Sequence, residues 1–146
     1  MTGLLLLVFA IVAGAFLPMQ AGVNATLAKY VGGAVRASFV SFAIGAIVLL
    51  VVVALFYRGE HTRAGHAPWW AWIGGALGAF YVTSTVVVPP RMGAAAFFGI
   101  LVAAQLVMSV LADQFGWLAF EQKSITPLRA VGVAMLVGGA VLVRVF

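Results

Sequence analysis

Two amide side chains lie four residues apart in the first apolar stretch, in the run Pro18-Met19-Gln20-Ala21-Gly22-Val23-Asn24. Residues at this spacing share one face of a helix, so Gln20 and Asn24 are expected to point the same way. Polar groups in hydrocarbon are costly unless paired, and they tend to mark functional sites. Gln20 and Asn24 are therefore candidates to bind a solute. The alternative is that they join helices, at about 0.6 kcal/mol each, and the two interpretations are compatible.

Pro18 lies one turn before this pair and removes one helical hydrogen bond. It is expected to kink the first helix, or to break it near Pro18. A broken helix exposes backbone groups that must line a cavity or be buried in protein. Broken membrane helices of this kind are typical of transporters.

A second polar stripe lies further along the chain, where Gln105, Ser109 and Asp113 follow at intervals of four residues. Gln105 falls near the middle of its apolar stretch and is a candidate to bind substrate. Asp113 falls at the end of the stretch, where we expect it to be solvated or paired with a base of the loop rather than part of a proton relay. Tyr81 and Ser41 are weaker candidates for the substrate site. A Ser hydroxyl such as that of Ser41 commonly bonds to its own helix instead.

The sequence contains no constellation that would carry enzymatic chemistry. It has no cysteine, no phosphate-binding loop, no HExxH pair and no Ser-His-Asp set, so no nucleophile, general acid or metal site is apparent. His61 and His66 lie in a polar loop and suggest no metal centre. We expect no enzyme activity, no cofactor and no metal.

Only 8% of the 146 residues are charged and 65% are hydrophobic, whereas soluble domains carry about 25% charged residues. The composition excludes a soluble globular protein, and the scattered basic residues give no patch for nucleic acid. A bilayer core about 30 Å thick needs roughly 20 apolar residues of helix. We predict an all-α integral membrane protein of one domain, residues 1–146, with five transmembrane helices near 4–28, 34–57, 68–88, 92–113 and 127–146.

Prolines and glycines agree with these boundaries. Pro68 and Pro127 stand at expected helix starts, where the missing N–H costs little, and Gly32-Gly33 separates the first two helices. Pro89-Pro90 is expected to end the third helix. Small residues at four-residue spacing predict close helix packing, at Gly74 with Gly78 and at Ala134 with Gly138. A cleaved signal peptide at the start of the chain is disfavoured, because it would need a basic segment.

The basic residues are divided equally between the two sides of the membrane. With five crossings, the side of Met1 holds Arg58, Arg63, Lys123 and Arg129, and the other side holds Lys29, Arg36, Arg91 and Arg144. Orientation normally follows an excess of Lys and Arg in cytoplasmic loops. With no excess, we favour insertion in both orientations, followed by pairing of oppositely inserted copies. The alternative is that one or two charges fix a single orientation.

The run from Gly14 through Pro18, Gln20 and Asn24 to Leu27 resembles the first-helix signature of the YdcZ-type family, in the drug/metabolite transporter (DMT) superfamily. Further similar segments are Pro68-Trp69-Trp70 with Gly74 to Ala79, Pro90 to Ala95, Gln105 to Gly116, and Thr126 to Arg129. The resemblance covers essentially the whole chain, and its first-helix motif is the most specific part.

The resemblance implies a five-helix unit equal to half of a ten-helix DMT-type transporter, related to small multidrug resistance and EamA-type transporters. A lone five-helix chain would rebuild the inverted pair of halves as an antiparallel homodimer. The small multidrug resistance proteins use a Glu within the first helix, and this chain has neutral Gln20 and Asn24 there. That difference argues against proton-coupled cation export and favours a neutral or zwitterionic solute.

The expected function is therefore transport of a small-molecule substrate across the bacterial inner membrane, in a lipid bilayer, by alternating access. A structural or accessory membrane subunit that packs against a partner protein is the alternative. A passive channel would need a continuous polar lining, which the isolated polar residues do not provide.

Overall fold

The computed structural model describes residues 2–57, 64–117 and 120–146. Five helical stretches within them are long and apolar enough to cross a bilayer: Gly3–Val31, Ala34–Phe56, Trp69–Met92, Ala94–Phe115 and Pro127–Val145. The described residues contain helices and no strand. The predicted all-α membrane fold is confirmed, and the predicted boundaries differ from these by about one helical turn at most.

The contacts of the chain fall into two compact units, Met1–Val87 and Val88–Phe146. The first contains α1 (Thr2–Val31), α2 (Ala34–Phe56), η1 (Ala64–His66), η2 (Trp69–Ile73) and α3 (Gly74–Val87), and the second contains α4 (Pro89–Met92), α5 (Ala94–Phe115) and α6 (Pro127–Val145). That the whole chain forms one domain stays a prediction.

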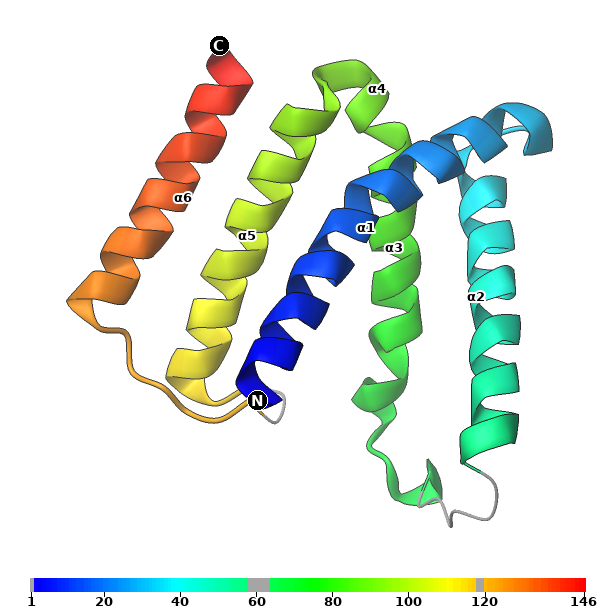
Figure 1. The fold of residues 1–146 in the computed structure, drawn as a ribbon, viewed down its shortest axis with the longest axis horizontal. Helices are drawn as coiled ribbons and strands as arrows, with labels where there is room; N and C mark the ends of the chain where they lie inside the picture. Colours follow the sequence, from blue (N-terminus) through cyan, green and yellow to red (C-terminus); the bar gives the residue numbers. More distant parts are fainter. Residues whose placement is uncertain (1, 58–63, 118–119) are drawn as a thin grey trace. The chain divides into compact units, whose positions relative to one another are not determined.

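In the first unit, α1, α2 and α3 each contact the other two. α1 and α2 meet at a tight turn and diverge away from it, as Figure 1 shows. Gly32 and Gly33 form this turn with φ of 81° and 130°, which are left-handed values that favour glycine. The predicted break between the first two helices is therefore confirmed, and its cause is the backbone conformation of these two glycines.

Of the two outcomes expected at Pro18, a kink or a break, the break is wrong, because α1 continues through Pro18 as one helix of 30 residues. Figure 1 shows instead that α1 changes direction along its length. A single proline removes one hydrogen bond and kinks the helix, while the bonds of the flanking turns keep it helical. No backbone segment is unwound here to bind a solute.

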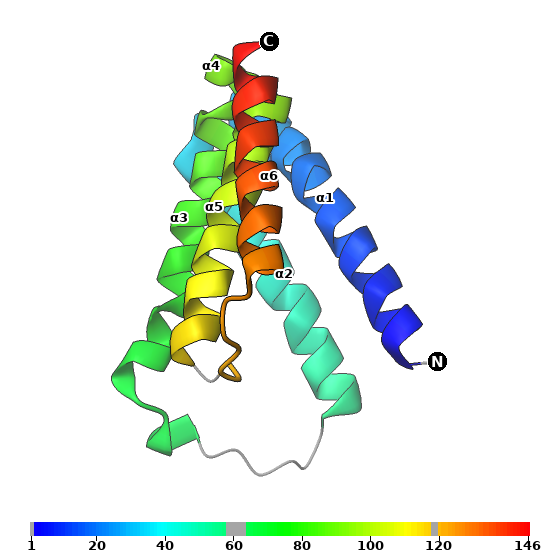
Figure 2. The ribbon, with the colours of Figure 1, turned by 90° about the vertical axis from the view of Figure 1, so that its left-hand side faces the viewer.

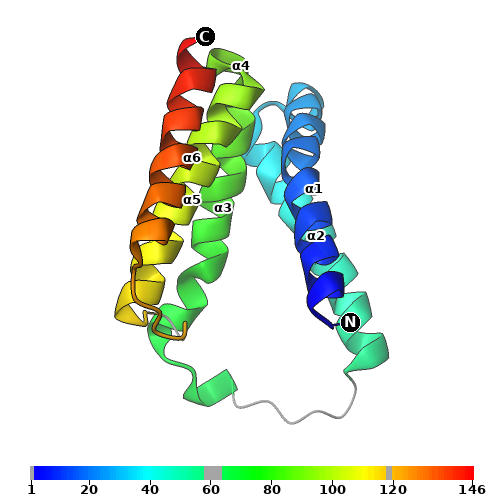
Figure 3. The ribbon, with the colours of Figure 1, turned by 60° about the vertical axis from the view of Figure 1, so that its left-hand side comes forward.

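In the second unit, α5 and α6 pack side by side and run in opposite directions (Figures 1 and 3). α3 ends at Val87, as the proline pair predicted, but Pro89 and Pro90 then begin the extra turn α4. Proline is tolerated there because the first helical N–H groups have no partner within a helix. Pro127 occupies the first turn of α6 in the same way, and the Thr126 hydroxyl caps it by accepting from Arg129 N.

Several hydrogen bonds fix the connection between α5 and α6, which folds back before α6 begins (orange in Figure 2). The guanidinium of Arg129 pairs with the carboxylate of Asp113 at 2.5 Å and also donates to the Lys123 carbonyl. The Lys123 amide donates to the Asp113 carbonyl at 2.8 Å. Asp113 is thus paired with a base, as expected from its place at a helix end.

Only some of the predicted small residues lie at close helix contacts. A Cβ on Gly78 would lie 3.2 Å from Cζ of Phe42, so α2 and α3 approach closely there. Gly74 and Gly138 have no described atom within 4 Å of such a Cβ. The closest approach of α5 to α6 at a glycine uses Gly99 instead, which faces Ala140 at 3.6 Å.

We expect Arg129→Ala to lower the free energy of unfolding by about 1–2 kcal/mol, because it leaves a half-buried carboxylate without its charged hydrogen bond. Thermal unfolding in detergent measures the change. Lys123→Ala is the matched control: the Lys123 side chain is 64% exposed and lies 4.0 Å from Glu121, so its loss should change little. Equal effects of the two substitutions would contradict this role of Arg129.

Candidate functional site

The buried polar residues of the described chain all lie in the first unit, one on each of its long helices. Asn24 on α1 is 2% exposed, Ser38 on α2 is 4% exposed and Thr85 on α3 is 5% exposed. The other buried residues on these helices are small or β-branched: Ala21, Ala37, Val82 and Val86. Each of the three long helices of the first unit therefore buries one polar side chain.

Two of these three buried side chains are satisfied by hydrogen bonds. The Thr83 hydroxyl donates to Ser38 Oγ at 3.1 Å, which joins α3 to α2. The Thr85 hydroxyl donates to the Val82 carbonyl of its own helix at 2.7 Å. Among the described residues, Nδ2 of Asn24 has no hydrogen-bond partner. Buried polar groups are nearly always bonded, so the unbonded Asn24 donor is an unusual feature of the first unit.

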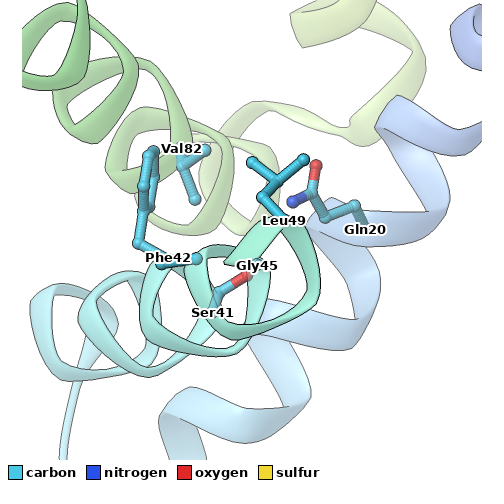
Figure 4. Close-up of a pocket in the computed structure, with 7 residues that line it drawn as sticks. Gln20, Ser41, Phe42, Gly45, Leu49 and Val82 are labelled. Carbon is cyan, nitrogen blue, oxygen red and sulfur yellow. The ribbon is translucent and has the colours of Figure 1, made fainter. Parts of the chain in front are cut away.

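A cavity of about 280 Å³ opens among the same three helices. Gln20 on α1 and Val82 on α3 border it, and α2 supplies the other side, with Ser41, Phe42, Gly45, Ala46 and Leu49. Figure 4 shows the Gln20 amide directed toward Leu49, and the Ser41 hydroxyl beside Gly45. The lining is apolar apart from one amide and one hydroxyl, so it suits a small solute with an apolar part and a hydrogen-bonding group.

The predicted site residues are divided between the two units. Gln20 and Ser41 line one cavity, and Asn24 lies one turn from Gln20 on α1. Tyr81 lies on α3, half-buried, and its carbonyl accepts from Ser84 Oγ. Gln105 lies on α5 in the second unit.

Sequence reasoning missed the apolar side of the cavity and one polar contact. Phe42, Leu49 and Val82 are ordinary residues for a membrane helix, and no signal in the sequence separates those that line a cavity from those that face lipid. The Thr83–Ser38 bond was also missed, because which hydroxyls meet across α2 and α3 depends on how the helices are rotated.

The described helices that border the cavity carry basic residues at their ends, Lys29 on α1 and Arg36 on α2, but no acidic residue. The described helices α1, α2 and α3 contain no Asp or Glu, and Asp113 of the second unit is paired with Arg129. Within the described residues, no group of three His, Cys, Asp or Glu could hold a metal ion. His66 is exposed, while Arg58, Glu60, His61 and Arg63 lie outside the described residues. The chemistry available to the site is hydrogen bonding by neutral groups.

Comparisons with known proteins agree on one family. Residues 5–142 match the model of the family DMT_YdcZ, described as "Putative inner membrane exporter, YdcZ". The chain is similar to inner membrane protein YdcZ of Escherichia coli strain K12, with 33% identity over 105 residues. This match covers 66% of each chain, just under two thirds of the relative's length. No solved structure matches the chain.

We expect Asn24→Leu to raise the free energy of unfolding by about 1 kcal/mol, because it removes a buried donor that has no partner. Thermal unfolding in detergent measures this. Ser38→Ala is the comparison variant: it leaves the Thr83 hydroxyl without its acceptor and should lower stability by about 0.6 kcal/mol, the mean for a polar contact between membrane helices. If Asn24→Leu is as destabilising as Ser38→Ala, Asn24 joins helices and is not held free for a ligand.

Proposed function

Because the chain belongs to the DMT_YdcZ family and is a multi-pass protein of the bacterial inner membrane, we propose that it transports small solutes across that membrane by alternating access. The observation that carries the proposal is the free donor of Asn24, one helical turn from the cavity residue Gln20. A stability role would not need an unbonded amide in the interior, whereas a solute with an acceptor group would satisfy it.

The substrate class follows from the groups around the cavity. Amides donate and accept hydrogen bonds without charge, and the described helices of the first unit supply no carboxylate to neutralise a cation. The apolar surface of Phe42, Leu49 and Val82 would hold the remainder of the solute. We propose a neutral or zwitterionic solute bound by Gln20 and Asn24, with Ser41 and Tyr81 of the same unit as further ligands. Gln105 of the second unit is proposed as a substrate-binding residue from its mid-helix position in the sequence.

We propose further that the working unit is an antiparallel homodimer of oppositely inserted copies. The equal number of basic residues on the two sides of the membrane gives no preferred orientation. The cavity beside Gln20 is bordered by three helices of one chain, and a second copy would complete the pathway.

The site is tested by ligand-induced thermal shifts, using purified protein and a set of amino acids, polyols and other neutral or zwitterionic solutes. A solute that binds only the folded protein raises its melting temperature. We expect Gln20→Ala and Asn24→Ala each to weaken that shift, and the double variant to abolish it and solute flux in proteoliposomes.

Thr26→Ala is the matched control for these substitutions. Thr26 is an exposed polar residue of the same helix, and its hydroxyl donates to the Gly22 carbonyl at 3.0 Å, so binding should be unchanged. A folded Gln20→Ala, Asn24→Ala protein with normal binding and flux would refute the site. Stable purification only with a partner protein would favour the accessory-subunit alternative.

Dual insertion is tested by labelling His66→Cys, an exposed position in a chain without other cysteines. A membrane-impermeant maleimide is added to intact cells, and a second label is added after permeabilisation. We expect comparable fractions of the protein to react in the two steps. Reaction in only one of them would show a single orientation.

A further inference from the structure

Gln105 occupies the middle of α5, the best-packed helix of the second unit. α5 runs from Ala94 to Phe115 over 22 residues, about 33 Å at 1.5 Å per residue, which matches the thickness of the hydrocarbon core. Eleven residues of α5 precede Gln105 and ten follow it. If α5 spans the hydrocarbon core evenly, the side-chain amide of Gln105 lies at the midplane of the membrane.

The side chain of Gln105 points away from α6. The α5 residues toward α6 include Gly99, which faces Ala140, and the buried Ala103 and Val110. At 100° per residue, all three lie more than a quarter-turn around the helix from Gln105. Gln105 is exposed, so α6 does not cover its side chain, although Ala112 two turns further along the same face is buried.

No hydrogen bond of the Gln105 side chain is present within the described part of the chain. Ser109, the nearest hydroxyl on the same face, donates to the backbone carbonyl of Gln105 at 2.8 Å and leaves the side-chain amide unbonded. An amide at the midplane finds no water, so an unpaired Gln105 would be costly. A polar group of another element must cover it.

We propose that two copies of Gln105 bond to each other across the two-fold axis of the antiparallel homodimer. The two-fold axis of an antiparallel dimer lies in the plane of the membrane, at its midplane. A residue and its copy in the other chain are therefore at the same depth only if the residue lies at the midplane. An amide is self-complementary, because one N–H and one oxygen of each side chain satisfy the other. The remaining N–H and lone pair of each Gln105 stay available to a solute.

This inference rests on the dimer proposed above and states where its axis passes. It predicts which residues of the two α5 helices meet. Leu101 and Ser109 flank Gln105 by one turn on either side, so Leu101 of one copy lies level with Ser109 of the other. The two Ser109 residues are separated by about 12 Å along the membrane normal, beyond the reach of a disulfide.

Cross-linking of single-cysteine variants tests the arrangement, since the natural chain has no cysteine. After oxidation in native membranes, Gln105→Cys should shift from the monomer to the dimer band on a non-reducing gel. Two differently tagged chains, one with Leu101→Cys and one with Ser109→Cys, are then co-expressed. We expect a disulfide between them, seen as a dimer band that carries both tags. Ser109→Cys expressed alone should stay monomeric. Ile100→Cys is the matched control, exposed but on another face of α5, and should not cross-link.

The outcomes separate this inference from the proposal on which it rests. The Leu101–Ser109 pair keeps Gln105, so it reports on the axis even if Gln105→Cys misfolds. A dimer found by amine-reactive cross-linking that forms neither disulfide would overturn the inference alone. A Ser109–Ser109 disulfide would show parallel chains and overturn both the inference and the antiparallel dimer. Absence of any dimer would also overturn both. The proposed solute site at Gln20 and Asn24 would still be tested separately, by the thermal shifts and flux.

Discussion

Hydrocarbon offers no hydrogen-bond partner, so the polar groups within the membrane-spanning helices must find their partners in the protein or in a bound molecule. Hydroxyl groups find such a partner locally, because a Ser or Thr can donate to a backbone carbonyl of its own helix, as Thr26, Thr85 and Ser109 do. The amides of Gln20, Asn24 and Gln105 have no such local solution. These amides are therefore the groups for which a partner outside the helix, such as a solute or another chain, has to be sought.

Few side chains of the described residues are buried. The buried hydrophobic residues are mostly alanine and valine, and no large side chain in the described residues is fully enclosed. Leucine, isoleucine and phenylalanine face outward in large numbers, as expected where lipid is the solvent. Helix association then depends on close backbone approach and a few polar bonds, such as Gly99 against Ala140 and Thr83 with Ser38. A core of this kind leaves room for the cavity beside Gln20.

The helices were predictable because charge, glycine and proline act locally. A charge is excluded from the bilayer core wherever it occurs, so the uncharged stretches gave the spans, and Gly32 with Gly33 gave the turn between the first two. The effect of Pro18 was not predictable in the same way, since the turns on either side decide whether a helix bends or breaks. The pairing of Asp113 could be expected from its place at a helix end. The residues that line the cavity could not be predicted, because the sequence does not show how apolar helices are rotated about their axes.

The connection between α5 and α6 has a consequence for how the chain enters the membrane. With the last turn of α5 and the first turn of α6, it carries two acids and two bases, Asp113, Glu121, Lys123 and Arg129. Asp113 and Arg129 form an ion pair. Carrying one unbalanced charge across a membrane potential of about 100 mV involves roughly 2.3 kcal/mol of electrical work. This connection has no net formal charge, so the electric field does no net work on it in either direction. The membrane potential by itself therefore gives residues 113–129 no preferred side of the membrane.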